Sequence, residues 1–412
     1  MSDFQTAVKT AERKMREFFP ATPLEFSEKL SAKFGAKIFL KREDLSPVRS
    51  YKIRGALNFF ASFLAENSNS KKSFVCASAG NHAQGFAFCC ANFKVRGKIF
   101  MPTPTPKQKI DRTKKIGGEF VEIVLRGDVV DESLTAAAEI CEKENSIFVP
   151  PFDHEKVIVG AGTIGAEIEK EISPDLILTP VGGGGICAGI FKFFENSKTE
   201  VFPVEADGQQ TLTKCLAAGE NLMNDEMDIF CDGTAVKKIG KKPWEILQNL
   251  KIAPQLCPEN RVAKTILEFL NFDGIILEPS GALAIDALKN FDKNFLKNKI
   301  VVAVCSGGNF DFARLPDLNE RAMKFTGRKK YFILSLPQRP GALREFLEIL
   351  GPHDDIARFE YLKKSARAFG SILLGIETTR AENFANFLEK VHAKKFGIRD
   401  ITDDQILTDF VV

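Results

Sequence analysis

The chain has 412 residues, more than one hydrophobic core usually supports, so we expect two or three domains. Apolar residues make up 44%, and 57 Lys and Arg nearly balance 54 Asp and Glu, which argues against a disordered chain and a nucleic-acid-binding surface. No apolar run is long enough to span a bilayer, and charged residues interrupt the segment from Met1 to Phe19, so we expect neither a membrane protein nor a signal peptide.

The nine cysteines are an odd number without a Cys-x-x-Cys pair, and there are only four histidines. This pattern favours neither a disulfide framework nor a zinc site. We therefore expect a protein of the reducing cytoplasm.

From Lys37 to Gly308, short β-branched or aromatic runs alternate with helical stretches whose apolar period is near 3.6. Such alternation is typical of a parallel α/β fold. The predicted strands are Lys37–Leu40, Ser73–Ala77, Lys98–Met101, Phe120–Leu125, Asp175–Thr179, Val201–Glu205 and Lys299–Val304.

Three of these strands end in polar turns that contain glycine. The turns are Ser78–Asn81, Val181–Gly185 and Cys305–Asn309. Because the carboxyl ends of parallel strands face one crevice, we expect the three turns to converge at a cofactor.

The second turn holds four consecutive glycines, Gly182, Gly183, Gly184 and Gly185, before a predicted helix at Ile186–Glu195. Glycine loses the most conformational freedom on folding, so such a run indicates a close approach of the backbone to another group. Phosphate is the ligand that a helix start favours, although a tight turn without a ligand would look the same.

The same stretch fits a second pattern. Gly183, Gly185 and Ala188 match a dinucleotide-binding fingerprint, with Glu205 at the end of the next strand where a ribose-binding carboxylate would lie. A nicotinamide-dependent dehydrogenase is therefore an alternative that the glycines alone leave open.

The pattern changes after Lys324, where Gly327–Lys330 is a predicted linker. Beyond it we expect a βαββαβ order, the ferredoxin-like α+β arrangement. The predicted elements are a strand at Tyr331–Leu336, a helix at Ala342–Leu350, strands at Arg358–Leu362 and Ser371–Glu377, a helix at Ala381–Lys394 and a closing strand at Ile406–Val411.

Lys52, in the segment Ser50–Ala56, lies near the start of a predicted helix, where the helix dipole disfavours a cation. Alone, such a lysine would more often be a solvated surface residue. Together with the three turns it completes four ordered motifs, and over about residues 10–323 the chain resembles the fold-type II pyridoxal-phosphate enzymes of the serine/threonine dehydratase family.

The resemblance implies a fold like that of the tryptophan synthase β chain. A catalytic domain of residues 1–327 would contain two parallel-sheet subdomains, the smaller one inserted at about residues 46–153. The cofactor would be pyridoxal 5'-phosphate, with Lys52 as the Schiff-base lysine and as the base for the α-proton. Both roles require the lowered pKa of a desolvated lysine.

The resemblance also assigns the groups around the cofactor. Gly182 to Ile186 would cradle the phosphate, Asn81 would hydrogen-bond the ring oxygen, and Ser306 would contact the pyridine nitrogen. A neutral hydroxyl cannot hold that nitrogen protonated, so the ring is a weaker electron sink, which favours β-elimination over transamination. The substrate carboxylate would meet the N–H groups of Ser78, Ala79, Gly80, Asn81 and His82.

Other residues carry weaker indications. We expect His82 to be structural rather than a catalytic acid or base. Glu278–Ala282 and Asp232–Lys237 resemble family motifs near the cofactor, but structural turns would look the same. Some relatives have a cation site that begins at the equivalent of Glu205; because Thr211 stands where an acidic ligand would be, we predict no metal.

Residues 328–412 resemble the single ACT-like regulatory domain of short biosynthetic threonine dehydratases, with matching stretches at Gln338–Leu343 and Arg358–Tyr361. This resemblance implies β-elimination of L-threonine to 2-oxobutanoate and ammonia in isoleucine biosynthesis, with weaker activity on L-serine. Isoleucine would be the candidate effector, at the Arg339–Gly341 turn, unless the domain only packs subunits. We expect a homo-oligomer, a dimer or a tetramer.

Two rival functions stay open. One is a serine-acting dehydratase or racemase on the same fold, since threonine and serine differ by one methyl group. The other is a non-catalytic amino-acid sensor with a vestigial cofactor site. The intact set of Lys52, Asn81 and Ser306 argues against the sensor.

Overall fold

The computed structural model describes residues 2–69, 71–362 and 368–404. The chain divides into two compact units, Met1–Asp311 and Phe312–Val412. The boundary that we predict, between residues 327 and 328, lies after helix α14 (Leu315–Phe325), which the structure groups with the second unit.

The first unit contains two sheets, a six-stranded sheet in the order β1-β2-β10-β7-β8-β9 and a four-stranded parallel sheet in the order β5-β4-β3-β6. Each predicted strand is present to within one or two residues at either end. The three strands that we did not predict, β1, β6 and β9, are only two or three residues long. The bounds are β1 Leu24–Phe26, β2 Lys37–Arg42, β3 Phe74–Ala77, β4 Gly97–Met101, β5 Val121–Leu125, β6 Ile147–Phe148, β7 Leu176–Pro180, β8 Glu200–Ala206, β9 Gln255–Cys257 and β10 Ile300–Cys305.

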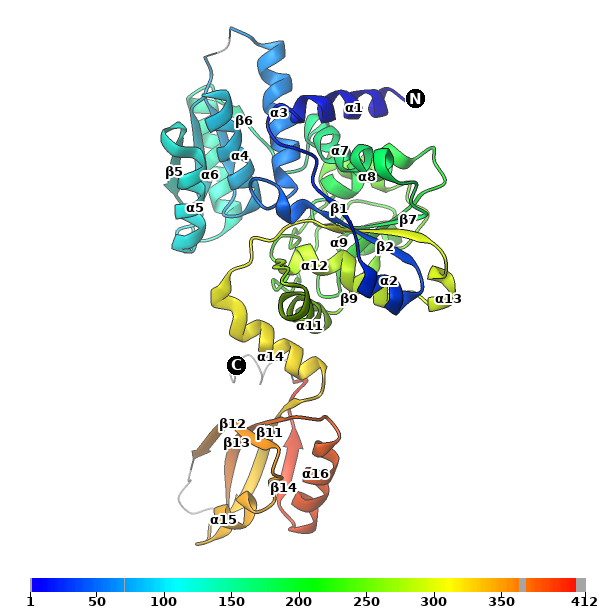
Figure 1. Cartoon of the computed structure of the whole chain (residues 1–412). Helices are drawn as coiled ribbons and strands as arrows, with labels where there is room; N and C mark the ends of the chain where they lie inside the picture. The colour runs from blue at the N-terminus through cyan, green and yellow to red at the C-terminus, as the bar shows by residue number, and fades with distance from the viewer. Residues whose placement is uncertain (1, 70, 363–367, 405–412) are drawn as a thin grey trace. The chain divides into compact units, whose positions relative to one another are not determined.

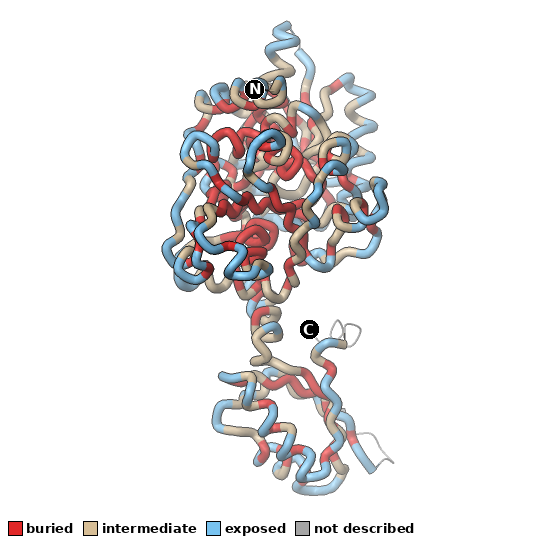
Figure 2. The backbone as a smooth tube through the Cα atoms, turned by 90° about the vertical axis from the view of Figure 1, so that its right-hand side faces the viewer, coloured by how far each residue is buried: buried red, intermediate tan, exposed pale blue. Residues whose placement is uncertain are grey.

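Helices cover both faces of the six-stranded sheet, with α7 and α8 on one side and α11 and α12 on the other (Figure 1). The central strands β7 and β10 are therefore apolar and buried along nearly their whole length, as parallel strands between helices usually are. Figure 2 shows buried backbone gathered in the interior of the first unit. The helices are α1 Asp3–Met15, α2 Glu28–Phe34, α3 Lys52–Glu66, α4 Asn81–Phe93, α5 Lys107–Gly117, α6 Val130–Lys143, α7 Glu155–Glu171, α8 Gly185–Phe194, α9 Thr211–Ala218, α10 Lys241–Leu247, α11 Glu259–Glu268, α12 Pro279–Asp286 and α13 Lys293–Leu296.

Helices α3 and α7 touch at glycines. A Cβ atom on Gly160 would collide with the main chain of α3 at Arg54 and Gly55, and one on Gly55 would come within 2.6 Å of a methyl group of Val157. This close contact fixes the start of α3 against α7, which matters because Lys52 is the first residue of α3.

The second unit has a four-stranded antiparallel sheet in the order β12-β13-β11-β14. The chain order is βαββαβ, so the ferredoxin-like prediction is confirmed. After α14 come β11 Lys329–Pro337, α15 Ala342–Leu347, β12 Asp354–Leu362, β13 Phe369–Thr378, α16 Asn383–Ala393 and β14 Gly397–Asp400.

Several details of the second unit differ from the prediction. Helix α15 ends at Leu347 and not at Leu350, and β12 begins at Asp354, four residues before the predicted Arg358. Lys329 and Lys330, which we assigned to the linker, lie in β11 because they pair in register with Glu377 and Ile376. The fourth strand of the sheet is β14, which follows α16 after a short turn; the strand predicted at Ile406–Val411 lies outside the described residues.

All nine cysteines are free, and eight of them are buried. Within the described ranges, the structure has no helix long and apolar enough to cross a membrane.

Candidate active site

Lys52 is the first residue of α3 and lines a small pocket with Tyr51, Pro151, Phe152 and Gly185. Its Nζ donates a hydrogen bond to the carbonyl oxygen of Pro151 at 3.1 Å. Burial lowers the pKa of the Lys52 amine to about 8, although the charge of Glu278 acts in the opposite direction. This amine therefore loses its proton far more readily than an exposed lysine.

The glycine turn borders the same pocket. Gly184 has a φ of +89°, a left-handed conformation that favours glycine, and it is the N-cap of α8 without a side chain that caps the helix. A Cβ on Gly183 would lie 2.5 Å from the ring of Phe152. The predicted juxtaposition of Lys52 with the glycine turn is present, with Gly185 in the lining of the Lys52 pocket.

The Asn81 turn meets the turn after β10 through side-chain amides. Asn309 Nδ2 donates to Asn81 Oδ1 at 2.6 Å, and Asn81 Nδ2 donates to Glu278 Oε1 at 2.7 Å. Helix α4 begins at Asn81 and its N-cap, Gly80, offers no side-chain acceptor, so the first N–H groups of this helix are free of a side-chain cap.

Ser306 is buried beside the start of α3. Its carbonyl oxygen accepts the N–H of Tyr51 at 3.0 Å, and its hydroxyl lies 3.4 Å from the carbonyl oxygen of Ser280. An isolated bridge between Ser50 and Gly307 joins the same two segments. The structure thus brings Ser306 close to Lys52 in space. The two residues are 254 positions apart in the sequence, and no local pattern links them.

Glu278, whose role the sequence left open, belongs to this cluster. Burial raises the pKa of its carboxyl to about 7, with a further increase from Asp232, while hydrogen bonds from the Asn81 side chain and the Asn309 N–H oppose the shift. Gly307 leaves room for it, because a Cβ there would collide with Glu278 Oε1. A carboxyl that is about half protonated near neutral pH therefore faces Asn81.

The side chain of His82 contacts the main chain near the site. Its Nε2 lies 2.9 Å from the carbonyl oxygen of Val149, and the ring is buried. Burial, together with the neighbouring Lys52 charge, lowers the pKa of His82 to about 3. The ring is therefore neutral at physiological pH and donates to Val149.

Glu205 has a structural role that weakens the dehydrogenase alternative. Its carboxylate accepts the N–H groups of Leu212 and Thr213 at 2.7 and 2.9 Å and the Thr213 hydroxyl at 2.7 Å. It therefore caps α9 and is not free to bind a ribose. The hydroxyl of Thr211 donates to the carbonyl oxygen of Val236 at 3.1 Å.

The residues present fit a phosphorylated pyridine aldehyde. The uncapped, glycine-lined start of α8 can receive a phosphate, the Lys52 amine can bond an aldehyde carbon, and Asn309 Oδ1 is a buried acceptor with no partner among the described residues. Sequence reasoning missed Tyr51, Phe152 and Asn309 as parts of the site. Asn309 is the last residue of the glycine-containing turn Cys305–Asn309 and could have been found from it, whereas nothing in the local sequence pattern indicates that Phe152 belongs to the site.

Comparisons with known proteins agree with this geometry. Residues 16–307 match the family model described as pyridoxal-phosphate dependent enzyme. Residues 320–411 match the model described as the C-terminal regulatory domain of threonine dehydratase.

Among curated relatives, the chain is 40% identical to the protein named L-threonine dehydratase biosynthetic IlvA of Halalkalibacterium halodurans, over 98% of this chain and 97% of that protein. It is also 40% identical to the protein of the same name from Bacillus subtilis, over 98% and 96% of the two chains. Among solved structures, the processed form of threonine deaminase isoform 2 from Solanum lycopersicum matches with a TM-score of 0.72 and 36% identity, over 78% of this chain and 89% of that one.

Proposed function

The chain belongs to the family of pyridoxal-phosphate-dependent enzymes, and on this premise we propose that it is a threonine dehydratase, which converts L-threonine to 2-oxobutanoate and ammonia. The observation that carries the proposal is the buried amine of Lys52, with a pKa of about 8, in a pocket that it shares with the glycine turn. When bound, the cofactor supplies an electron-withdrawing ring that makes the α-proton of the amino acid acidic.

Lys52 would hold the cofactor covalently, and its Nζ would also be the acceptor for the α-proton of the substrate. Its low pKa suits both roles, because each needs the neutral amine. The start of α8, from Gly182 to Ile186, binds the cofactor phosphate. The start of α4, from Ser78 to His82, binds the substrate carboxylate at its uncapped N–H groups.

Asn81 and Ser306 set the orientation and electronics of the ring. The Asn81 amide would donate to a ring oxygen, and its own oxygen accepts a hydrogen bond from Asn309. The neutral hydroxyl of Ser306 would be the partner of the pyridine nitrogen and, unlike a carboxylate, would not hold that nitrogen protonated. Loss of the β-hydroxyl, which carries the electron pair away from Cβ, is therefore favoured over transamination.

Serine is expected to be a weaker substrate. It lacks one methyl group, a difference that is worth about 1–3 kcal/mol in an apolar pocket, so discrimination on the order of 10- to 200-fold is expected. Racemisation of serine is the second candidate activity on this fold. The elimination proposal is preferred because curated relatives at 40% identity over nearly the whole chain carry the name threonine dehydratase.

For the second unit we propose regulation by isoleucine, with the coupling carried to the catalytic unit. The ferredoxin-like sheet and the match to a regulatory domain support this proposal. The isoleucine site at the Arg339–Gly341 turn stays a prediction; in the structure α15, which follows this turn, is shorter than expected, and Arg339 forms a bidentate ion pair with Glu345. We also propose a homo-oligomer in the cytoplasm, where nine free cysteines would stay reduced.

The test of regulation is a titration of threonine turnover with isoleucine on the full chain, beside calorimetry with isoleucine alone. An affinity coupling of about 1–3 kcal/mol is expected, and threonine must weaken isoleucine binding by the same factor. A full chain that neither responds to isoleucine nor binds it would remove the effector from the proposal and leave a packing role for the second unit.

A further inference from the structure

Arg54, two residues after Lys52, is wholly buried and uses every nitrogen of its guanidinium. It donates to Glu43 at 2.7 and 2.9 Å and to Glu167 at 2.7 and 2.8 Å. The hydroxyls of Thr22 and Thr163 accept from it at 3.0 Å each. Arg54 is therefore the centre of an ion-pair network enclosed by protein.

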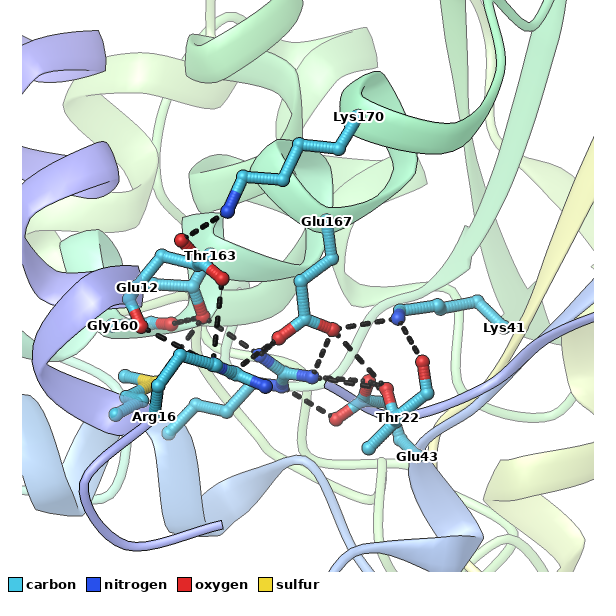
Figure 3. Close-up of polar contacts among 11 residues, drawn as sticks. Glu12, Arg16, Thr22, Lys41, Glu43, Gly160, Thr163, Glu167 and Lys170 are labelled. Atoms are coloured by element: carbon cyan, nitrogen blue, oxygen red, sulfur yellow. Dashed lines mark hydrogen bonds and ion pairs between the residues drawn. The ribbon is translucent and has the colours of Figure 1, made fainter. Parts of the chain in front are cut away.

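Two further cations pair with Glu167 (Figure 3). Lys41 Nζ donates to Glu167 at 2.6 Å and to the carbonyl oxygen of Thr22 at 2.6 Å, and Arg16 pairs with Glu167 at 2.6 Å. Burial alone would raise the pKa of Glu167, but Arg54 and Lys41 bring it to about 2. Glu167 therefore stays charged, and its oxygens are occupied by Arg54, Lys41 and Arg16.

The network joins three elements at the start of α3. Glu43 follows β2, Glu167 and Thr163 belong to α7, and Arg54 lies in the first turn of α3. Helix α7 also provides Val157 and Ala161 to the wall of the Lys52 pocket. Any shift of the first turn of α3 relative to α7 would thus move the Lys52 amine in its pocket.

The first turn of α3 lacks the usual stabilising features. Its N-cap, Tyr51, makes no side-chain capping bond, and the turn has no acidic residue, while Lys52 places a cation at the positive end of the helix. The Lys52 N–H is bound by the hydroxyl of Ser50 at 3.2 Å. Lys52 and Arg54 are separated by about 200° around the axis, so the amine and the guanidinium leave the helix on nearly opposite sides.

We propose that Arg54 is a positioning residue, which through its buried contacts with Glu43 and Glu167 holds the first turn of α3 so that the Lys52 amine stays in the pocket at the Pro151 carbonyl. This role rests on the proposed function of Lys52. The charged or titratable groups that face the amine from the other side are Glu278 and His82, with Tyr51 beside it. The Arg54 guanidinium bonds to Glu43, Glu167, Thr22 and Thr163 instead, and only the main-chain N–H of Arg54 meets Tyr51, at its carbonyl oxygen at 2.9 Å.

The test measures Lys52 itself in the cofactor-free protein. Brief reductive methylation at a series of pH values, with peptide mass spectrometry, gives the midpoint at which Lys52 becomes reactive, and wild type should show about 8. Arg54→Lys keeps the charge but cannot make the fork of contacts, so the midpoint should rise by about one unit or more, a tenfold smaller neutral fraction. With cofactor, kcat should fall roughly 100-fold while KM for threonine changes little.

A matched control separates positioning from stability. Arg261 forms an ion pair with the buried Asp286 at 2.7 Å. The pair joins α11 to α12 and includes no residue of α3. Arg261→Lys should lower thermal stability yet leave the Lys52 midpoint and kcat unchanged. If Arg54→Lys does not fold, Thr163→Val keeps every charge and removes one acceptor of Arg54, and it should raise the midpoint by a smaller amount.

A folded Arg54→Lys with the wild-type midpoint and kcat overturns the proposal, as does an unshifted Thr163→Val if that variant has to be used. Failure of the proposed function has a different signature. In that case the wild-type chain would leave L-threonine unchanged, or Lys52→Ala would retain turnover, whereas the Lys52 midpoint of the cofactor-free protein would still report on Arg54.

Discussion

The two units of the chain place their charged groups differently. In the catalytic unit, Arg54 and Lys41 pair with Glu43 and Glu167, and none of these four side chains is more than 1% exposed. In the described part of the second unit, the core is built from apolar residues such as Phe332, Phe346 and Ile372. Its ion pairs range from Lys329–Glu320, with both side chains 11% exposed, to pairs on the surface.

The difference follows from what each unit has to do. Glu278 and His82 are buried, Lys52 is half-buried with its amine inside a pocket, and all three have shifted pKa values, as groups at catalytic sites often do. Keeping such groups in place requires surrounding residues that are held rigidly by hydrogen bonds and ion pairs. The second unit needs only a packed apolar core under its sheet. Each of the following predictions tests one side of this contrast.

Lys52→Ala should have the largest effect. Without the amine, no covalent attachment of the cofactor and no acceptor for the α-proton remain, so threonine turnover should be lost and the visible absorbance of the attached cofactor should disappear. Lys33→Ala, at an exposed position of α2, is the control and should behave as wild type. Threonine turnover that survives Lys52→Ala would show that Lys52 is no more important for the reaction than the exposed Lys33.

Glu167→Gln should destabilise the catalytic unit by about 3–5 kcal/mol, because it leaves Arg54 and Lys41 without a full partner charge in the protein interior. The single tryptophan, Trp244, lies in α10 of this unit, so its fluorescence during urea unfolding reports on the catalytic unit alone. Glu171→Gln, exposed on the same helix, should leave the midpoint unchanged. Equal midpoints for both variants would mean that the network contributes no stability.

Phe346→Ala should cost the second unit about 3–5 kcal/mol through loss of a fully buried ring. Hydrogen exchange should speed up in β11 and β13, with no change in the Trp244 transition. Leu347, its neighbour, is 44% exposed, so Leu347→Ala should have a much smaller effect on exchange. Faster hydrogen exchange in the catalytic unit of Phe346→Ala would contradict the view that the two units have independent hydrophobic cores.

His82→Leu should cost about 1–3 kcal/mol at neutral pH, because the carbonyl of Val149 loses its donor. The pKa of His82 is about 3 in the folded protein and 6.5 in the unfolded chain, so the unfolded state binds the extra proton between these values. The stability that His82 contributes is thus present above pH 6.5 and is lost as the pH falls toward 3. The difference between wild type and variant should narrow over that range, and a constant difference would show that His82 is not buried neutral.

Arg339→Gln should have the smallest effect. Its ion pair with Glu345 lies on the surface of the second unit, with the two side chains 54% and 39% exposed. No change in the hydrogen exchange of β11 is expected at moderate salt. A clear loss of hydrogen-exchange protection in β11 would show that the Arg339–Glu345 ion pair stabilises the second unit, against the account.

Much of the fold followed from local pattern. The apolar runs at Leu176–Pro180 and Ile300–Cys305 marked buried parallel strands because helices cover both of their faces. The very short strands β1, β6 and β9 were not predicted, because two or three residues are too few to show an alternating pattern. Lys329 and Lys330 read as a linker from their charge, yet their cross-strand pairing puts them in β11.

The site divides in the same way. The motif residues of the site, Lys52, Asn81, Gly182–Gly185 and Ser306, were accessible to sequence reasoning because they stand in marked turns or at a helix start. The partners that support them were not. Asn309 with Asn81, Glu278 with Asn81 and Phe152 over Gly183 are contacts between distant segments, which only the tertiary structure brings together.

The most direct test of the account is a single sequence of measurements on the purified full chain. Cofactor is added, the visible absorbance is recorded, and L-threonine follows, with 2-oxobutanoate and ammonia assayed against time. The account predicts an absorbance band that changes when threonine is added, and equal amounts of the two products, with Lys52→Ala showing neither. A chain that binds the cofactor through another residue, or that leaves threonine unchanged, would contradict it.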